Sequence, residues 1–339
     1  MDLEEITQRR ICDVLSRHQL NFVWTPSEEA QVWRVVEPQP NHRSDVVAPH
    51  RDISNRDISI SPKTLAWVKR HRASTKASRE HHAILTWGSL LGAPRVIQCV
   101  DDRTLLLEHC SGLTIEKLGS NQALGAELLG AQVAMLHERL IKDEDNLPLL
   151  KAIAMRAQTA LSDTSLQTSI SADFGRDVYD QAVHLITELK TPRVAWSTLS
   201  DQAYALLTER IPCHRDLTGD HLRFSNQETL HLRVLDWGQS RLDSWTSDWV
   251  KLSVEWSDQP DLWQSAWCSY WQRRTHHVHH TERSLIKSLA YTELNRALAL
   301  QAINTLRWSK RHRIRQNEYA DEVWSRGVKE LSVMMKRRR

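Results

Sequence analysis

Long apolar runs are missing from this chain: none reaches 18 residues, so the sequence offers no candidate for a membrane-spanning helix. The N-terminus, MDLEEITQRRICDVL, also lacks the apolar core of a signal peptide. Five cysteines are present, an odd number with no Cys-x-x-Cys spacing, which argues against a disulfide framework and against a structural zinc site. Free thiols suit a reducing compartment, so we expect a cytoplasmic protein.

An excess of charge of one sign is lacking too, because the formal net charge of the 339 residues is only +3. This balance excludes a protein that binds nucleic acid through its overall charge. The basic residues near the C-terminus have no interleaved aromatic residues, so a solvated tail explains them better than nucleic acid or membrane binding. Glycine is scarce as well, with 10 residues and none before Gly88, which excludes a glycine-rich phosphate loop in the first part of the chain.

The pattern of apolar residues changes near residue 111. Before this point, a helical segment at 75–90 accompanies strand-like segments rich in β-branched and aromatic residues, at 31–36, 64–69, 95–100 and 104–109. After it, helical spacing dominates, most clearly at 121–141 and 281–306. We therefore predict an α+β chain with a small sheet-rich N-terminal lobe (residues 1–110, including a leading helix) and a larger helical lobe (residues 111–339).

Two acidic residues, Asp216 in His-Arg-Asp and Asp236 in Asp-Trp-Gly, stand 20 positions apart. Between them, apolar segments at 222–224 and 230–235 flank a polar Ser-Asn-Gln-Glu turn, a pattern typical of a β-hairpin. Because a hairpin brings the chain back to its start, we expect the two carboxylates to become neighbours. One could orient a substrate hydroxyl while the other binds a metal ion, which is the arrangement of a phosphoryl-transfer site.

These residues resemble those of the aminoglycoside phosphotransferase family, which shares a bilobal protein-kinase-like fold with choline and fructosamine kinases. The resemblance covers most of residues 20–310 and is most specific at 211–248. It implies that Asp216 orients the acceptor hydroxyl and accepts its proton, and that Arg215 beside it belongs to the catalytic residues. It also implies that Asp236 binds the Mg²⁺ ion that bridges the phosphates, and that Asp248 ties down the catalytic loop without taking part in the chemistry.

The resemblance also implies nucleotide-binding residues in the first lobe. Lys69 would reach the α- and β-phosphates of ATP, and Glu80 on the next helix would pair with it and hold its ammonium group in place. Backbone groups near Glu108–Cys110 would bind the edge of the base, which makes Glu108 and Cys110 cofactor-binding positions. The alternative for Lys69 is a solvated lysine among neighbouring arginines.

Two positions depart from the family pattern. His221 stands where the family usually has an asparagine as second metal ligand, and an imidazole nitrogen favours Mn²⁺ or Zn²⁺ over Mg²⁺. His221 is therefore a candidate metal ligand that makes Mn²⁺ an alternative to Mg²⁺, although it could merely pack or hydrogen-bond. The segment Thr25–Val32, with two adjacent glutamates that would repel phosphate, takes the place of the glycine-rich loop.

We therefore expect an ATP-dependent O-phosphotransferase that transfers the γ-phosphate to a hydroxyl of a small molecule, such as an antibiotic or a secondary metabolite. It would work as a monomer or weak dimer, with no nucleic acid or membrane partner. Acids and tryptophans at 243–263 would suit a cationic or amphipathic acceptor, although the tryptophans could equally be core residues.

Two other classes of function remain open. A catalytically silent module that binds a nucleotide or metabolite would also lack the glycines and could also carry His221. A protein kinase would share the His-Arg-Asp motif, but no Ala-Pro-Glu motif or long activation segment follows Asp236 here. Helix-forming sequence begins within ten residues of Asp236, which leaves no room to dock an extended peptide.

Overall fold

The computed structural model describes residues 21–25, 30–36, 64–139, 198–226, 229–314 and 320–338, together with a few isolated positions. The expected connection at 37–63, most of the leading helix and the helical segments expected between 150 and 197 lie outside the described residues. The chain forms two compact units. The first comprises Met1–Ser111 with Leu235–Gln239, and the second comprises Gly112–Val234 with Ser240–Arg339.

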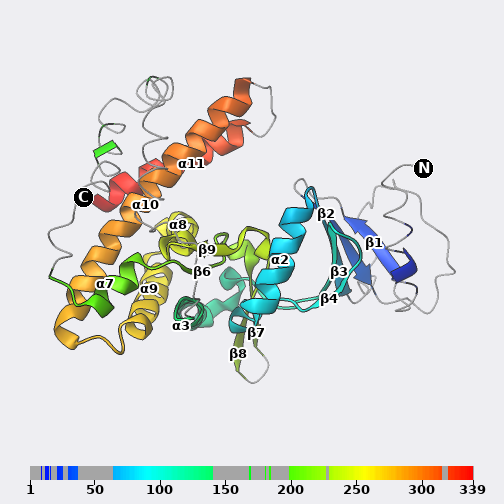
Figure 1. Cartoon of the computed structure of the whole chain (residues 1–339), viewed down its shortest axis with the longest axis horizontal. Coiled ribbons are helices and arrows are strands. Elements are labelled where there is room, and N and C mark those ends of the chain that lie inside the picture. Colours follow the sequence, from blue (N-terminus) through cyan, green and yellow to red (C-terminus); the bar gives the residue numbers. More distant parts are fainter. Residues whose placement is uncertain are drawn as a thin grey trace. The chain divides into compact units, whose positions relative to one another are not determined.

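The first unit contains an antiparallel sheet of five strands in the order β1-β2-β3-β5-β4 (Figure 1). Its strands are β1 (Asn21–Thr25), β2 (Ala30–Val36), β3 (Thr64–His71), β4 (Val96–Cys99) and β5 (Thr104–Glu108). Helix α2 (Ser74–Thr86) and the 3₁₀ turn η1 (Gly88–Leu91) connect β3 to β4, and the short turn η6 (Trp237–Gln239) also belongs to this unit.

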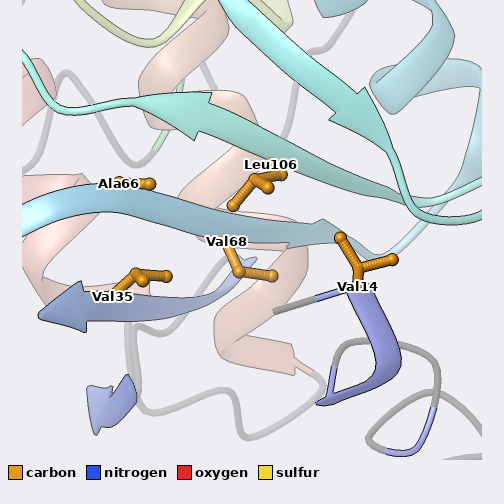
Figure 2. Packing of buried hydrophobic residues seen from close by; sticks show 5 residues of the cluster. All are labelled: Val14, Val35, Ala66, Val68 and Leu106. Carbon is orange, nitrogen blue, oxygen red and sulfur yellow. The ribbon is translucent and has the colours of Figure 1, made fainter. Parts of the chain in front are cut away.

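Apolar side chains on one face of the sheet form a core in the first unit. Val35 of β2, Ala66 and Val68 of β3, and Leu106 of β5 are buried together with Val14 (Figure 2). Because side chains alternate along a strand, Lys69 and His71 lie on the face of β3 opposite to Val68. The alternation thus places the buried core on one face of the sheet and Lys69 and His71 on the other.

The second unit consists mainly of helices, with two small antiparallel sheets formed by β6 with β9 and by β7 with β8. Its strands are β6 (Ile211–Cys213), β7 (Leu222–Asn226), β8 (Leu230–Val234) and β9 (Arg241–Asp243). Its α-helices are α3 (Gln122–His137), α7 (Asp201–Thr208), α8 (Thr246–Glu255), α9 (Pro260–Arg274), α10 (His280–Ile314) and α11 (Ala320–Arg338). Its 3₁₀ turns are η2 (Ile115–Asn121), η5 (Gly219–His221) and η7 (Trp256–Asp258).

Helices α3 and α9 pack closely because a glycine lies at their contact. A Cβ atom on Gly130 of α3 would stand only 2.1 Å from the carbonyl oxygen of Ala266 in α9. Beside this contact, α8 and α9 bury an aromatic cluster in which most ring pairs meet edge to face, comprising Trp245, Trp249, Trp263, Trp267, Tyr270 and Trp271. Five of the 14 tryptophans of this sequence therefore help to build the core of the second unit.

The structure agrees with most of the elements predicted from the sequence. The strands predicted in the first lobe correspond to β2, β3, β4 and β5, and the predicted hairpin corresponds to β7 and β8. Strands β1, β6 and β9 were not predicted, since the last two have only three residues each and show no periodicity. No helix in the described part of the chain has the length and apolar character needed to cross a membrane.

Candidate functional site

Lys69 lies at the centre of an ion network in the first unit. Its Nζ atom is 2.9 Å from Oε2 of Glu80 on α2 and 2.8 Å from Oδ1 of Asp236. Glu80 is fully buried and also receives Nε2 of His71 at 2.6 Å. A lysine held between two carboxylates is placed in one position before any ligand binds. The Lys69–Glu80 pair expected from the sequence is thus present, and His71 joins it.

The ion network keeps both partners charged despite their burial. Burial opposes the charge on Lys69, but the carboxylates of Glu80 and Asp236 outweigh it, and the pKa of Lys69 is raised above its ordinary value. Burial likewise opposes the charge on Glu80, but Lys69 and His71 outweigh it, and the pKa of Glu80 is lowered. A permanent ammonium group therefore faces Asp236 at neutral pH.

Asp236 lies in a strained turn that the first unit holds in place. Its φ angle is +59°, in the left-handed region that non-glycine residues rarely adopt and that costs about 1–3 kcal/mol. The next residue, Trp237, is fully buried and donates its backbone N–H to Oε1 of Glu80 at 3.2 Å. About 40% of the Asp236 side chain is exposed, so a hydrated metal ion could reach this hard oxygen ligand.

The predicted base-binding segment lies at the end of β5. The backbone N–H of Glu108 donates to the carbonyl of Arg95, and the N–H of His109 donates to the carbonyl of Leu65. Cys110 is buried. The cofactor-binding role of Glu108 and Cys110 stays a prediction.

In the second unit, the loop that carries Asp216 begins at a second strained residue. Arg215 has a φ angle of +68°, and its Nε atom lies 2.9 Å from Oδ2 of Asp243 in β9. Asp248 of α8 holds this loop through backbone groups, since it accepts the N–H of His214 at 3.1 Å and also that of Arg215. The side chain of Arg215 is thus bound away by Asp243, which suits a role in shaping the loop, and its catalytic role stays a prediction.

Asp248 is itself fixed by a buried chain of hydrogen bonds. His137 at the end of α3 binds Oδ2 of Asp248 through Nε2 at 3.0 Å, and its Nδ1 atom lies 2.8 Å from the hydroxyl of Tyr270. Burial lowers the pKa of His137 and raises that of Tyr270, so both groups are neutral. The arrangement is complete if Tyr270 donates to Nδ1 and Nε2–H donates to Asp248. The structure thus supports the anchoring role expected for Asp248.

Cys213 completes a buried Cys-His-Asp cluster with His137 and Asp248 whose ligand atoms all lie within 4.8 Å of one another. Burial raises the pKa of the Cys213 thiol well above its ordinary value, and its S–H group can donate to the carbonyls of Ile211 and Ser244. The hydrogen bonds of these three side chains connect α3, the loop and α8, so we interpret this cluster as the anchor of the loop.

Asp216 is partly exposed and forms an ion pair that the sequence analysis missed. One of its carboxylate oxygens, Oδ1, binds the Nζ atom of Lys251 on α8. Its backbone N–H donates to Nδ1 of His214 at 3.2 Å, which turns the loop sharply around the buried His214 ring. The carboxylate is therefore set in a defined orientation at a surface from which a substrate hydroxyl could approach.

His221 uses one ring nitrogen to close the same loop. Its Nδ1 atom lies 2.6 Å from the carbonyl oxygen of Asp216 and 3.2 Å from the hydroxyl of Thr218. A carbonyl accepts only, so Nδ1 carries the proton and the lone pair stands on Nε2. Such a tautomer, with Nδ1–H bound to a carbonyl, is typical of histidines that bind metals through Nε2. The chemistry of His221 thus fits a metal ligand, a role that stays a prediction.

The loop ends at Gly219, which is held by Glu255 at the C-terminal end of α8. The backbone N–H of Gly219 lies 2.8 and 3.0 Å from the two carboxylate oxygens of Glu255. Burial, together with the charges of Asp220 and Glu116, raises the pKa of Glu255, although the bond from Gly219 opposes this shift. A side chain at position 219 would collide with this carboxylate, because a Cβ atom there would lie 2.4 Å from Oε1.

The tryptophans considered for substrate binding are core residues. Trp245 and Trp249 are fully buried, Trp256 is 1% exposed and Trp263 is 8% exposed. Asp243 and Asp248 are buried too and hold the loop, as described above. The alternative of an acceptor stacked on these indole rings is therefore wrong, and the core interpretation is confirmed.

In the described part of the chain, residues that the sequence analysis did not assign to the site contact the predicted groups directly, among them His71, His137 and Lys251. His71 could have been found, because it stands two residues after Lys69 on a strand and so shares its face. Lys251 could have been suspected from its helical spacing of three residues from Asp248. Asp216 belongs to the second unit and Asp236 to the first, so the expected pairing of their carboxylates stays a prediction.

Comparison with known proteins places this geometry in a class of folds. No protein-family model matches the sequence, and no curated protein matches it. Solved structures do match it along nearly its whole length. The GDP complex of an aminoglycoside 2'-phosphotransferase has a TM-score of 0.60 at 10% identity, with 98% of each chain covered.

Two further structures show the same likeness. A complex of aminoglycoside phosphotransferase APH(4)-Ia with ADP and hygromycin B has a TM-score of 0.57 at 10% identity, with 95% of this chain and 97% of that chain covered. Choline kinase from Cryptosporidium parvum Iowa II has a TM-score of 0.54 at 12% identity, with 99% and 97% covered. The chain thus has the α+β protein-kinase-like fold of these enzymes, and the fold predicted from the sequence is confirmed.

Proposed function

We propose that this protein is an ATP-dependent phosphotransferase that transfers the γ-phosphate of ATP to a hydroxyl group of a small molecule. The observation that carries the proposal is the ion network of the first unit, in which Lys69 is bound by both Glu80 and Asp236. In a protein-kinase-like fold this network provides one ammonium group for phosphate oxygens and one carboxylate for a divalent ion. The GDP and ADP complexes of the two aminoglycoside phosphotransferases support a nucleotide as the ligand.

The pairing of Asp216 with Asp236 is part of this proposal, and the hydrogen bonds of the second unit support it. On one side of the Asp236 segment, Val234 pairs with Leu222 in the β7–β8 hairpin. On the other side, the Ser240 hydroxyl donates to the carbonyl of His214, one position from the start of β9. Both ends of the segment are therefore attached beside the loop that carries Asp216. Since a chain extends at most about 3.6 Å per residue, this attachment supports the proposed pairing of Asp236 with Asp216.

In the proposed mechanism the chain's own residues position the reactants. Lys69 binds phosphate oxygens of the nucleotide. Asp236 and Nε2 of His221 would hold a divalent ion, Mg²⁺ or Mn²⁺, which would supply the positive charge that neutralises the phosphates. Asp216 orients the acceptor hydroxyl and takes its proton as the hydroxyl oxygen bonds to phosphorus. Backbone groups at Glu108–Cys110 contact the base. The strained turns at Arg215 and Asp236 aim the two acidic side chains.

The acceptor is proposed to be a small molecule and not a peptide. Helix α8 begins at Thr246, ten residues after Asp236, so no extended activation segment can form a peptide-docking surface. The matching structures include an aminoglycoside phosphotransferase bound to hygromycin B and a choline kinase. An antibiotic or another hydroxylated metabolite is therefore the class of acceptor to test, which would give the protein a role in resistance or in secondary metabolism.

The test is a screen for product followed by one substitution. The purified protein is incubated with ATP or GTP, Mg²⁺ or Mn²⁺, and a panel of hydroxylated compounds that includes aminoglycosides and amino alcohols, and mass spectrometry detects phosphorylated products. With an acceptor in hand, we expect Asp216→Asn to lower kcat by about 10²–10⁴-fold, because the variant loses the base while nucleotide binding is kept. Asp220→Asn, an exposed acid in the same loop, is the control and should retain kcat. Equal turnover of Asp216→Asn and wild type would overturn the assignment.

A further inference from the structure

Helix α8 holds the Asp216 loop at three points along a single stripe. Asp248, Lys251 and Glu255 are spaced by three and four residues, so they lie on one face of the helix. Asp248 accepts the backbone N–H groups of His214 and Arg215, Lys251 binds the carboxylate of Asp216, and Glu255 accepts the N–H of Gly219. The loop from 214 to 219 is therefore held at its beginning, middle and end by one rigid element.

The middle contact differs from the other two because it reaches a side chain. Asp248 and Glu255 bind backbone amides and so fix the path of the loop. Lys251 instead binds Oδ1 of Asp216, which leaves Oδ2 as the oxygen of this carboxylate for another partner. A carboxylate that acts as a base needs one oxygen turned toward the proton, and an ammonium group on the other oxygen sets that rotation.

Stability alone does not account for this pair. The side chains of Lys251 and Asp216 are 31% and 19% exposed. Ion pairs that remain accessible to solvent contribute about 0–1 kcal/mol, and fixing a lysine side chain costs up to about 2 kcal/mol of conformational entropy. The pair therefore changes the free energy of unfolding little. Its main consequence is the orientation of the Asp216 carboxylate.

The surroundings keep the ammonium group in place. Lys251 stands on the turn of α8 that follows Asp248, whose side chain is fully buried and bound to His137. The charge of Lys251 also acts on Glu330 of α11, where it opposes the rise in pKa that burial causes. Lysine at position 251 thus has acidic neighbours on two elements, the Asp216 loop and α11.

We propose that Lys251 is a positioning residue for the phosphotransfer reaction: its ammonium group holds one oxygen of Asp216 so that the other oxygen receives the proton of the acceptor hydroxyl. This inference rests on the proposed function and adds a residue to it. The stripe of α8 then serves as the scaffold of the catalytic loop, with the two acids fixing the backbone and the lysine fixing the reactive group.

The test compares Lys251→Met with Lys251→Arg and with Lys287→Met, a control that removes an exposed lysine of α10. Methionine keeps the length of the side chain but not its charge. We expect Lys251→Met to lower kcat by about 10- to 100-fold, since a misplaced catalytic group costs up to about 10²-fold, with little change in KM for ATP or in Tm. Lys251→Arg should recover part of kcat, and an alkylammonium ion such as ethylammonium should raise the kcat of Lys251→Ala. Lys287→Met should match wild type.

The outcomes separate this inference from the proposed function. If wild type phosphorylates no acceptor, the proposed function fails and the role of Lys251 fails with it. If wild type is active and Asp216→Asn is not, but Lys251→Met turns over like Lys287→Met, only the role of Lys251 is overturned. A loss of activity in Lys251→Met that comes with a lower Tm, and that neither arginine nor ethylammonium restores, would show a purely structural lysine and would also overturn the inference.

Discussion

Among single residues, Glu330 provides a direct test of the packing of the second unit. It lies on α11 with only 2% of its surface exposed, and burial raises the pKa of its carboxyl group. Above the ordinary pKa of glutamate the unfolded chain ionises first, so the folded state loses stability as the pH rises toward the raised value. The Glu330→Gln variant has no carboxyl group to ionise at this position. We therefore expect its Tm to increase relative to that of wild type as the pH rises from 4 to 7.

The matched control for this prediction is Glu322→Gln on the same helix. Glu322 is exposed and only loosely paired with Arg326, at 3.6 Å. Its substitution should leave the difference in Tm from wild type independent of pH. A Glu330→Gln variant whose Tm runs parallel to that of wild type across this range would mean that the carboxyl group is not buried as the structure has it.

For single residues, the sequence predicted which side chains form the ion network better than it predicted their other contacts and their backbone angles. Lys69, Glu80 and Asp236 were recognised through the family resemblance, and the structure joins them in one network. Lys251 was not recognised, because its partner Asp216 is 35 residues away and the helical spacing of Lys251 from Asp248 does not identify that partner. The strain at Arg215 and Asp236 was equally invisible, since neither position carries the glycine that would mark a positive φ angle.

Among the elements, α3 and α9 approach so closely that their contact requires a glycine at position 130. Gly130 lies where a Cβ atom would approach the backbone of Ala266 to 2.1 Å, and a backbone atom cannot move aside as a side chain can. Alanine favours a helix over glycine by about 1 kcal/mol, so propensity alone predicts stabilisation. We expect the opposite: Gly130→Ala should lower the free energy of unfolding by about 2 kcal/mol or more in denaturant titrations.

Gly125 on the same helix is the matched control. A Cβ atom there would meet Cδ1 of Leu118 at 2.7 Å, which is the end of a flexible side chain that can turn away. Gly125→Ala should therefore change the free energy of unfolding by less than about 1 kcal/mol, since propensity and crowding oppose each other. Equal effects at the two positions would contradict the close approach of α3 to α9.

The sequence predicted the elements with strong periodicity and missed those without it. The β7–β8 hairpin was expected from two apolar segments around a polar turn, and its register pairs Leu222 with Val234. Strands β6 and β9 have three residues each, too few to show a periodic pattern, and they pair with each other in the structure. Their pairing matters for the site, because it attaches the chain after Asp236 next to the chain before Asp216.

For the whole molecule, the division into units does not follow the order of the chain. Residues Leu235–Gln239 belong to the first unit although the residues on both sides of them belong to the second. The reason is local: Trp237 is fully buried, and its backbone binds Glu80 of α2. A single boundary at residue 111, as predicted from the sequence, assigns Leu235–Gln239 to the second lobe and so cannot describe this exchange. The proposed metal ligand Asp236 is thus carried by a short piece of the first unit whose two ends continue into the second unit.

Metal preference is a property of the whole molecule, because a ligand that binds only the folded state raises the stability of the entire fold. With ATP present, we expect Mn²⁺ to raise the Tm of wild type more than Mg²⁺ does, since an imidazole ligand at His221 favours the softer ion. His221→Asn should reduce or reverse this difference. A tenfold change in affinity corresponds to about 1.4 kcal/mol and to a shift in Tm of about 2–4 °C.

The control is His231→Asn, which replaces an exposed histidine of β8 and should behave as wild type. Equal shifts with both ions in wild type and His221→Asn would exclude His221 as a ligand, and no shift with either ion would favour a module that does not use ATP.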